Sequence, residues 1–123
     1  MKTMVLAGQE VPAIGIGTWN MGDNPAKRNQ ELEAIQAGLD AGARVIDTAE
    51  MYGNGCSESL VGEAISSYHR SDLFLISKVL PQNSSRERLE PALDATLRRL
   101  QTNYLDLYLL HWRGSIPLEE TIH

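Results

Sequence analysis

Apolar and polar positions follow two regular patterns that alternate along the chain. Short runs that are mostly apolar occur at "IGIG" (14–17), "ARVID" (43–47), "DLFLISK" (72–78) and "YLDLYLLH" (104–111). Between these runs, apolar residues recur every three or four positions, as they do on the buried face of an α-helix. Strands that are apolar on both faces and alternate with amphipathic helices predict an α/β fold, in which a parallel sheet has helical crossovers.

The first two helices are predicted from residues that can begin or end them. The segment 24–42 has Asn24 as a candidate N-cap and Gly42 as its stop signal. The segment 57–68 has Ser57 as a candidate N-cap. Residues predicted to face the core of these two helices are Leu32, Ile35, Leu39, Leu60, Val61 and Ala64.

A third helix is predicted within 84–100, with leucines at helical spacing. Ser84 and Glu87 have the spacing of a capping box. Pro91 conflicts with a regular helix that starts so early, which leaves open a separate turn and a main helix from about Glu90. The last residues, "IPLEETIH", have the pattern of a fourth helix that is only beginning.

Chain length limits how much of such a fold is present. Residues 1–13 read as two short strands around a Gly8 turn, a hairpin, and residues 14–123 read as four β/α units with a truncated last helix. A complete (β/α)8 barrel needs about 250 residues. The 123 residues are therefore expected to hold about the first half of one.

Composition narrows the expected partners and location. The net charge of -5 disfavours nucleic acid and anionic membranes as partners. No stretch approaches the roughly 18 apolar residues of a membrane span, and the N-terminus lacks the apolar core of a signal peptide. A single cysteine, Cys56, cannot form an internal disulfide. Together these features predict a cytoplasmic protein.

Three successive predicted strands end at an ionisable residue. Asp47 ends the second strand, Lys78 follows the third, His111 follows the fourth, and Tyr52 lies in the loop after Asp47. Ligands bind at the carboxyl ends of the strands in parallel α/β sheets. We therefore expect these four side chains to converge at one mouth of an apolar barrel.

These residue types suit proton transfer to a carbonyl group. A tyrosine has a solution pKa of about 10 and is a poor acid, but a neighbouring ammonium stabilises its phenolate. A carboxylate can hold that ammonium in place, and a histidine can hydrogen-bond the substrate oxygen. None of these groups donates hydride, so reduction of a carbonyl requires a cofactor.

Each residue alone has a plainer interpretation. Asp47 can cap a turn, Tyr52 can anchor a loop, and Lys78 and His111 can be ordinary strand-end residues. All four at consecutive strand ends favour a site. A metal site on Asp47 and His111 is disfavoured, because a lysine opposes a cation and no further ligand is evident. Cys56 has no nearby basic partner in the sequence, which disfavours it as a nucleophile.

Tryptophans and glycines add two further observations. Trp19 and Trp112 follow predicted strands and can wall an apolar substrate pocket, although core packing is an alternative. Gly15 and Gly17 lack the third glycine of a dinucleotide fingerprint, and no acidic residue follows at the expected distance. Gly17 is better explained by close approach of backbone to a ligand, or by a tight bend.

At these residues the chain resembles the aldo-keto reductase superfamily. The blocks "GIGTW", "ARVIDTAEMYGNGCSESLVGEAI", "LFLISKV" and "LRRLQTNYLDLYLLHW" resemble characteristic blocks of that family, in the same order. The resemblance is closest to small bacterial members that reduce aldehydes. It implies a (β/α)8 TIM-type barrel and an oxidoreductase that uses NADPH, rather than NADH, without a Rossmann domain.

The resemblance also implies residue roles. Tyr52 is the expected general acid, Lys78 its activator, Asp47 the partner of Lys78, and His111 the group that orients the carbonyl. Residues expected near the nicotinamide and its ribose are Gly17, Thr18 and Asp47. Residues expected to contact a small carbonyl substrate are Trp19, Tyr52, His111 and Trp112. No metal is expected.

The second half of the family barrel has no counterpart in these residues. In the family that half supplies the aromatic residue that stacks on the nicotinamide, the pyrophosphate loop and the residues that bind the 2'-phosphate. We therefore expect negligible activity from this chain alone, and self-association through its exposed sheet edges. Two alternatives are a non-catalytic scaffold that senses cofactor or binds a partner, and a fragment with no function of its own.

Overall fold

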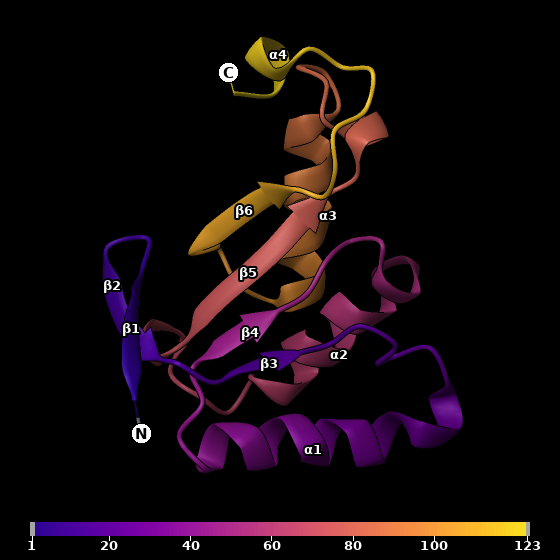
Figure 1. The fold of residues 1–123 in the computed structure, drawn as a ribbon. Coiled ribbons are helices and arrows are strands. Elements are labelled where there is room, and N and C mark those ends of the chain that lie inside the picture. Colours follow the sequence, from indigo (N-terminus) through magenta and orange to yellow (C-terminus); the bar gives the residue numbers. More distant parts are fainter. Residues whose placement is uncertain (1, 123) are drawn as a thin grey trace.

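A computed structural model describes residues 2–122, which form a small hairpin and a larger parallel sheet (Figure 1). The hairpin pairs β1 (Thr3–Leu6) with β2 (Gln9–Pro12) in antiparallel register. The parallel sheet has the order β3-β4-β5-β6, and its strands are β3 (Gly15–Gly17), β4 (Val45–Asp47), β5 (Phe74–Val79) and β6 (Leu107–Leu110). The predicted hairpin and parallel sheet are both confirmed.

Helices cover one face of the sheet and leave the other open (Figure 1). They are α1 (Arg28–Asp40), α2 (Cys56–Ala64) and α3 (Leu89–Leu100). A short α4 (Leu118–Ile122) lies beyond the carboxyl ends of the strands. The chain also contains the 3-10 turns η1 (Pro25–Lys27), η2 (Tyr52–Gly55), η3 (Arg70–Asp72) and η4 (Pro81–Asn83). No helix within residues 2–122 is long and apolar enough to cross a membrane. The alternation of strands and helices that the apolar pattern predicts is therefore present. The parallel sheet has four strands, whereas a closed barrel of this type has eight.

The main core lies between the sheet and the helices. Ile46 of β4 and Leu75 of β5 have no exposed surface, and they pack against the apolar faces of α1 and α2. Full burial of such a side chain stabilises the fold by about 1.5–3 kcal/mol. The predicted core residues Ile35, Leu39, Leu60, Val61 and Ala64 are all buried there, and Leu32 packs against them.

A second apolar cluster lies on the opposite, inner face of the sheet. Phe74 and Ile76 of β5 are buried there with Val11 of the hairpin. The hairpin therefore covers the amino-terminal end of the inner face. Elsewhere the inner face is open, and Leu109 of β6 is 39% exposed.

The predicted start of the second helix at Ser57 is wrong, because this side chain takes part in tertiary contacts instead. Gly55, at φ 93°, is the N-cap of α2, and Ser57 lies inside the first turn without exposed surface. The Ser57 hydroxyl donates to the backbone carbonyls of Thr18 and Met21. The predicted N-cap Asn24 is confirmed: its side chain accepts the N–H of Ala26 at 3.0 Å, at the start of the 3-10 turn that leads into α1.

The predicted capping box of the third helix is likewise absent. The Ser84 hydroxyl donates to the carbonyl of Pro81 at 2.6 Å, and α3 begins at Leu89. This start agrees with the alternative of a separate turn followed by a helix from about Glu90. Pro91 falls in the first turn of α3, where a missing N–H leaves no helical hydrogen bond broken.

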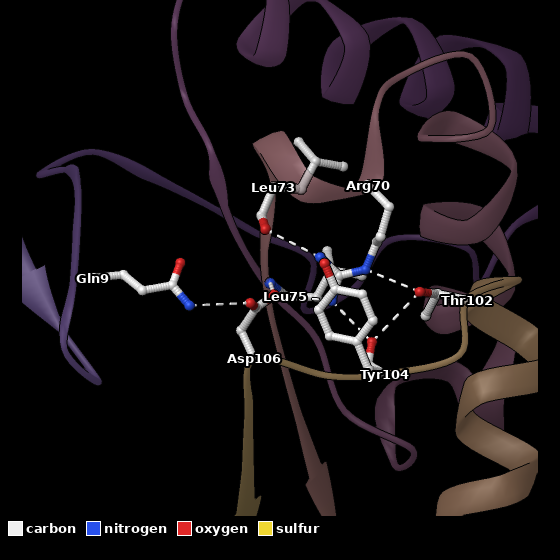
Figure 2. Close-up of polar contacts among 7 residues, drawn as sticks. All are labelled: Gln9, Arg70, Leu73, Leu75, Thr102, Tyr104 and Asp106. Atoms are coloured by element: carbon white, nitrogen blue, oxygen red, sulfur yellow. Dashed lines mark hydrogen bonds and ion pairs between the residues drawn. The ribbon is translucent and has the colours of Figure 1, made fainter.

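A group of polar contacts around Arg70, the Arg70 cluster, joins the amino-terminal ends of β5 and β6 (Figure 2). Arg70 pairs with the Asp106 carboxylate at 2.8 Å and donates to Thr102 Oγ1 at 2.9 Å. It also donates to the backbone carbonyls of Leu73 and Tyr104. Asp106 in turn accepts the N–H of Leu75 at 2.9 Å and a 3.4 Å bond from Gln9 of the hairpin. This end of the sheet is thus held by polar contacts, opposite the predicted mouth.

A buried ion pair joins α2, α3 and β5 beneath the sheet. Glu58 has no exposed surface, and its carboxylate accepts from Arg99 Nε at 2.7 Å and from the Ser77 hydroxyl at 2.6 Å. Helices α2 and α3 approach each other closely at Gly62 of α2. A Cβ atom at this position would lie only 2.2 Å from the Arg99 carbonyl oxygen of α3. Glu58 was not identified from the sequence, since nothing in its spacing distinguishes it from an exposed helical glutamate.

Candidate active site

The carboxyl ends of β4 and β5 bring Asp47 and Lys78 into contact. The strand register pairs Asp47 with Ile76, so Lys78 lies two residues further along β5 on the same face. Lys78 Nζ is 2.5 Å from Asp47 Oδ1 and donates to the Thr48 carbonyl at 2.9 Å. The lysine side chain is 15% exposed and the aspartate 44%. The ammonium is therefore held at the mouth by two oxygens of one loop.

Tyr52 reaches the same ammonium from the loop after β4. Lys78 Nζ lies 3.4 Å from the Tyr52 phenol oxygen and 5.1 Å from its ring centre. The chain then passes through positive φ angles at Gly53 (58°), Asn54 (53°) and Gly55 (93°) before α2 begins. These residue types adopt left-handed conformations most easily, which lets the chain turn sharply directly after the tyrosine.

His111 follows β6 and faces Tyr52 edge-on. Its backbone N–H donates to the Val79 carbonyl at 2.9 Å, which continues the pairing of β5 and β6 by one residue. The His111 ring centre is 5.7 Å from the Tyr52 ring and 4.9 Å from the Trp112 ring. Its Nδ1 atom is buried and has no hydrogen-bond partner among the described residues. The structure thus gathers all four predicted catalytic side chains, with His111 joined through ring contacts.

The surroundings of His111 at the mouth favour its neutral form. Burial lowers the pKa of His111 most, and the positive charge of Lys78 lowers it further. The negative charges of Asp47 and Glu50 offset part of this effect. A neutral imidazole has one N–H donor and one acceptor nitrogen, so at pH 7 the ring can donate to a carbonyl oxygen.

We expect His111 to titrate below the ordinary value of 6.5 in an NMR pH titration, and Lys78→Met to raise its pKa. The substitution removes a positive charge and leaves Asp47 unpaired, and both changes favour the imidazolium. Because the unfolded chain binds this proton at higher pH, His111 lowers stability as pH falls below 6.5. Exposed His69 is the internal control, and an unchanged His111 midpoint in Lys78→Met would contradict the prediction.

The residues expected near cofactor and substrate differ in accessibility. A Cβ on Gly17 would meet no atom within 4 Å, so its backbone is open to a ligand. Thr18 has no exposed surface, and its N–H and hydroxyl both donate to the Asp47 carbonyl, at 3.1 and 3.0 Å. Thr18 therefore supports Asp47 and presents no contact surface itself. Trp19 and Trp112 are 69% and 49% exposed, which excludes core packing within residues 2–122.

Other features of the surface do not coincide with this mouth. A cleft of about 410 Å³ between Asn54, Asn83 and Arg99 includes none of the four predicted catalytic residues. Within the described part of the chain, no group of three or more His, Cys, Asp or Glu side chains is placed to hold a metal ion.

One further residue, Glu50, lies beside the site with 8% exposure and was missed from the sequence. Its only sequence signal is its place between Asp47 and Tyr52.

Comparison with known proteins identifies relatives over nearly the whole chain. The profile of the Aldo/keto reductase family matches residues 13–123. Methylglyoxal reductase YeaE of Escherichia coli (strain K12) is 50% identical over 112 residues, which are 91% of this chain and 39% of that protein. Aldo-keto reductase YhdN of Bacillus subtilis (strain 168) is 38% identical over 93% of this chain and 38% of its own length.

Solved structures extend the similarity to the fold. An aldo-keto reductase from Klebsiella pneumoniae in complex with NADPH has a TM-score of 0.89 and 54% identity, over 92% of this chain and 39% of its own. The thermostable aldo-keto reductase Tm1743, in complex with the inhibitor epalrestat, has a TM-score of 0.93 and 43% identity over 98% of this chain and 47% of its own. The four-stranded sheet thus corresponds to part of a (β/α)8 barrel. The chain spans about two-fifths of the length of the first two relatives, and it belongs to the aldo/keto reductase family.

Proposed function

We propose that this chain supplies the catalytic residues of an NADPH-dependent reductase that converts aldehydes and ketones to alcohols. The proposal rests on one observation: the Lys78 ammonium lies between the Asp47 carboxylate, at 2.5 Å, and the Tyr52 phenol, at 3.4 Å. A phenol beside a fixed ammonium is suited to donate its proton to an oxygen that is gaining negative charge. The family membership and the NADPH-bound relatives support the same reaction.

Each side chain has a distinct part in the proposed reaction. NADPH, when bound, supplies the hydride that reduces the carbonyl carbon. Tyr52 donates its phenolic proton to the carbonyl oxygen, and Lys78 stabilises the phenolate that remains. Asp47 keeps Lys78 charged and in place. His111, neutral at pH 7, donates a hydrogen bond to the same carbonyl oxygen and orients it.

The mouth of this sheet fits a nicotinamide at one side. Gly17 offers open backbone next to Asp47, whose side chain is 44% exposed. These two residues would hold the nicotinamide ribose, with Thr18 fixing the Asp47 backbone from behind. Trp19 and Trp112 would flank a small carbonyl substrate. By the family resemblance, the remaining cofactor contacts come from the second half of the barrel.

An activity assay tests the function. We expect negligible NADPH oxidation by the chain alone with methylglyoxal, because it lacks most of the expected cofactor contacts. Fusion to the remaining C-terminal part of the E. coli relative, which is 50% identical here, should restore turnover. A folded, NADPH-binding fusion without turnover would count against the proposal, and ordinary turnover by the chain alone would contradict the need for the second half.

We also propose that the chain on its own associates through its open sheet. Strands β3 and β6 are both edges of the described sheet. Leu109 on the inner face is 39% exposed, and Trp112, after β6, is 49% exposed. Unpaired edges beside apolar surface favour pairing with another chain. Sedimentation velocity should show concentration-dependent association that Leu109→Lys weakens and Leu118→Lys, on α4, does not. Equal effects of the two substitutions would contradict association through the inner face.

A further inference from the structure

We propose that Glu50 is a positioning residue that clamps the loop carrying Tyr52 onto the end of β5, which carries Lys78. Its meaning for catalysis rests on the function proposed above. Glu50 is 8% exposed although it is charged, and it lies two residues before Tyr52. The hydrogen bonds of its backbone and side chain indicate why a glutamate is placed there.

The segment after β4 continues to pair with β5 in regular steps. The Thr48 N–H donates to the Ile76 carbonyl at 2.9 Å, and the Glu50 N–H donates to the Lys78 carbonyl at 3.3 Å. In a regular parallel ladder, the backbone carbonyl of Glu50 would next accept the N–H of Leu80. Instead, Leu80 donates its N–H to the side-chain Oε1 of Glu50 at 2.7 Å. The side chain thus replaces one backbone acceptor of the ladder.

This replacement allows the chain to leave the sheet immediately after Glu50. Met51 has helical dihedral angles, φ -71° and ψ -30°, and the Tyr52 N–H donates to the Ala49 carbonyl at 3.2 Å. This turn directs Tyr52 over the mouth and stops the backbone from following β5. Without the Glu50 carboxylate, the Leu80 N–H would lose the acceptor that holds the loop to the end of β5.

A second donor closes the clamp from the other side. The Asn83 side chain donates to the same Oε1 atom at 3.0 Å, while the Asn83 N–H donates to the Leu80 carbonyl at 2.9 Å. No lysine or arginine within residues 2–122 forms a salt bridge with Glu50. The carboxylate is therefore held by neutral donors, and what the site requires from it is an acceptor oxygen at a fixed reach.

The hydrogen bonds of Glu50 lie on both sides of Lys78 along β5 and the residues after it. Glu50 holds the carbonyl of Lys78 through its N–H and the N–H of Leu80 through its side chain. Loss of the side-chain contact would free the loop to move, and the 3.4 Å contact between Lys78 Nζ and the Tyr52 oxygen would lengthen. A misplacement of about 1 Å in a catalytic group can lower a rate by about 100-fold.

Side-chain length and charge can be separated by two substitutions. Glu50→Asp keeps the charge but shortens the reach, whereas Glu50→Gln keeps an acceptor oxygen at the same reach without the charge. We expect Glu50→Asp to lose amide exchange protection at Leu80 and the NMR ring contact between Tyr52 and His111. Glu50→Gln should keep both, as should the control Gln82→Ala in the neighbouring η4 turn.

The charge has its own readout at His111, whose ring faces Tyr52 and whose pKa responds to Lys78, Asp47 and Glu50. The Glu50 carboxylate raises that pKa, so Glu50→Gln should lower it while the ring contact persists. In the completed barrel, Glu50→Asp should lower kcat by about 10- to 100-fold with little change in KM, and Glu50→Gln should restore most of it.

Unchanged Leu80 protection and ring contact in Glu50→Asp would overturn the proposal, as would their loss in Glu50→Gln. Amide protection at Ile46 and Leu75 reports whether each variant is folded. If Glu50→Asp does not fold, Glu50→Gln decides alone, since it must fold and keep both signals. The amide protection and the ring contact can be measured without turnover. A completed barrel that keeps both signals but is inactive would therefore count against the proposed reductase function and not against the role of Glu50.

Discussion

Tyr52→Phe in the completed barrel is expected to lower kcat by about 10²- to 10⁴-fold, the range for loss of a general acid. The substitution removes only the phenol oxygen, which lies 3.4 Å from Lys78 Nζ, and it keeps the ring that contacts His111. Cofactor affinity should change little, because the loss concerns a proton needed only in the transition state. Steady-state NADPH oxidation with methylglyoxal, together with NADPH binding followed by fluorescence, measures both quantities.

A matched control is Tyr104→Phe. Tyr104 is 41% exposed, and its ring centre lies 3.9 Å from Arg70 Cζ. It belongs to the Arg70 cluster (Figure 2), at the opposite end of the strands from the candidate site. We expect its turnover to equal that of the unsubstituted barrel. Unchanged turnover in Tyr52→Phe would instead show that this phenol is not the general acid.

Arg99→Ala is expected to destabilise the chain by about 3–5 kcal/mol, the range for removing one partner of a buried ion pair. Glu58 has no exposed surface, and without Arg99 only the Ser77 hydroxyl would remain as a polar partner. An uncompensated carboxylate in that position opposes folding more strongly than the lost contact alone. Urea unfolding followed by circular dichroism measures the change in free energy.

Arg98→Ala is the control for this prediction. Arg98 is exposed on the same helix and makes only a 3.4 Å bond to the Asp94 carbonyl, so its removal should change stability by less than about 0.5 kcal/mol. Equal losses from Arg98→Ala and Arg99→Ala would show that the pair with Glu58 does not account for the effect. Replacing both Glu58 and Arg99 with leucine should recover much of the loss, because no buried charge then remains.

Several elements of the fold were predictable because their signals are local. The runs 43–47 and 72–78 are apolar on both faces, and the structure contains β4 and β5 there. Parallel strands joined by right-handed crossovers place their carboxyl ends on one side. A residue at the end of each strand therefore reaches a common mouth, and this explains how Asp47, Lys78 and His111 could be grouped from sequence spacing.

The wrong predictions concern polar side chains whose partners lie outside the motif that the sequence suggests. Ser57 and Ser84 have the sequence context of helix caps, but the hydroxyls bond to carbonyls of Thr18 and Pro81. Glu50 and Glu58 resemble exposed acids in the sequence and are buried in the structure. The partners of Ser57, Glu50 and Glu58 belong to other elements, which the local sequence does not specify. Ser84 instead bonds within the turn just before it.

The sequence by itself determined the order of strands and helices, the faces that carry apolar residues and the set of chemical groups at the strand ends, because these depend on periodicity and spacing. Only the tertiary structure decided which polar groups are paired. The 2.5 Å contact of Lys78 with Asp47, the burial of Glu58 against Arg99 and the use of the Glu50 side chain as a ladder acceptor join segments about 30 to 40 residues apart. Hydrogen bonds require distances and angles that arise only when these segments pack together.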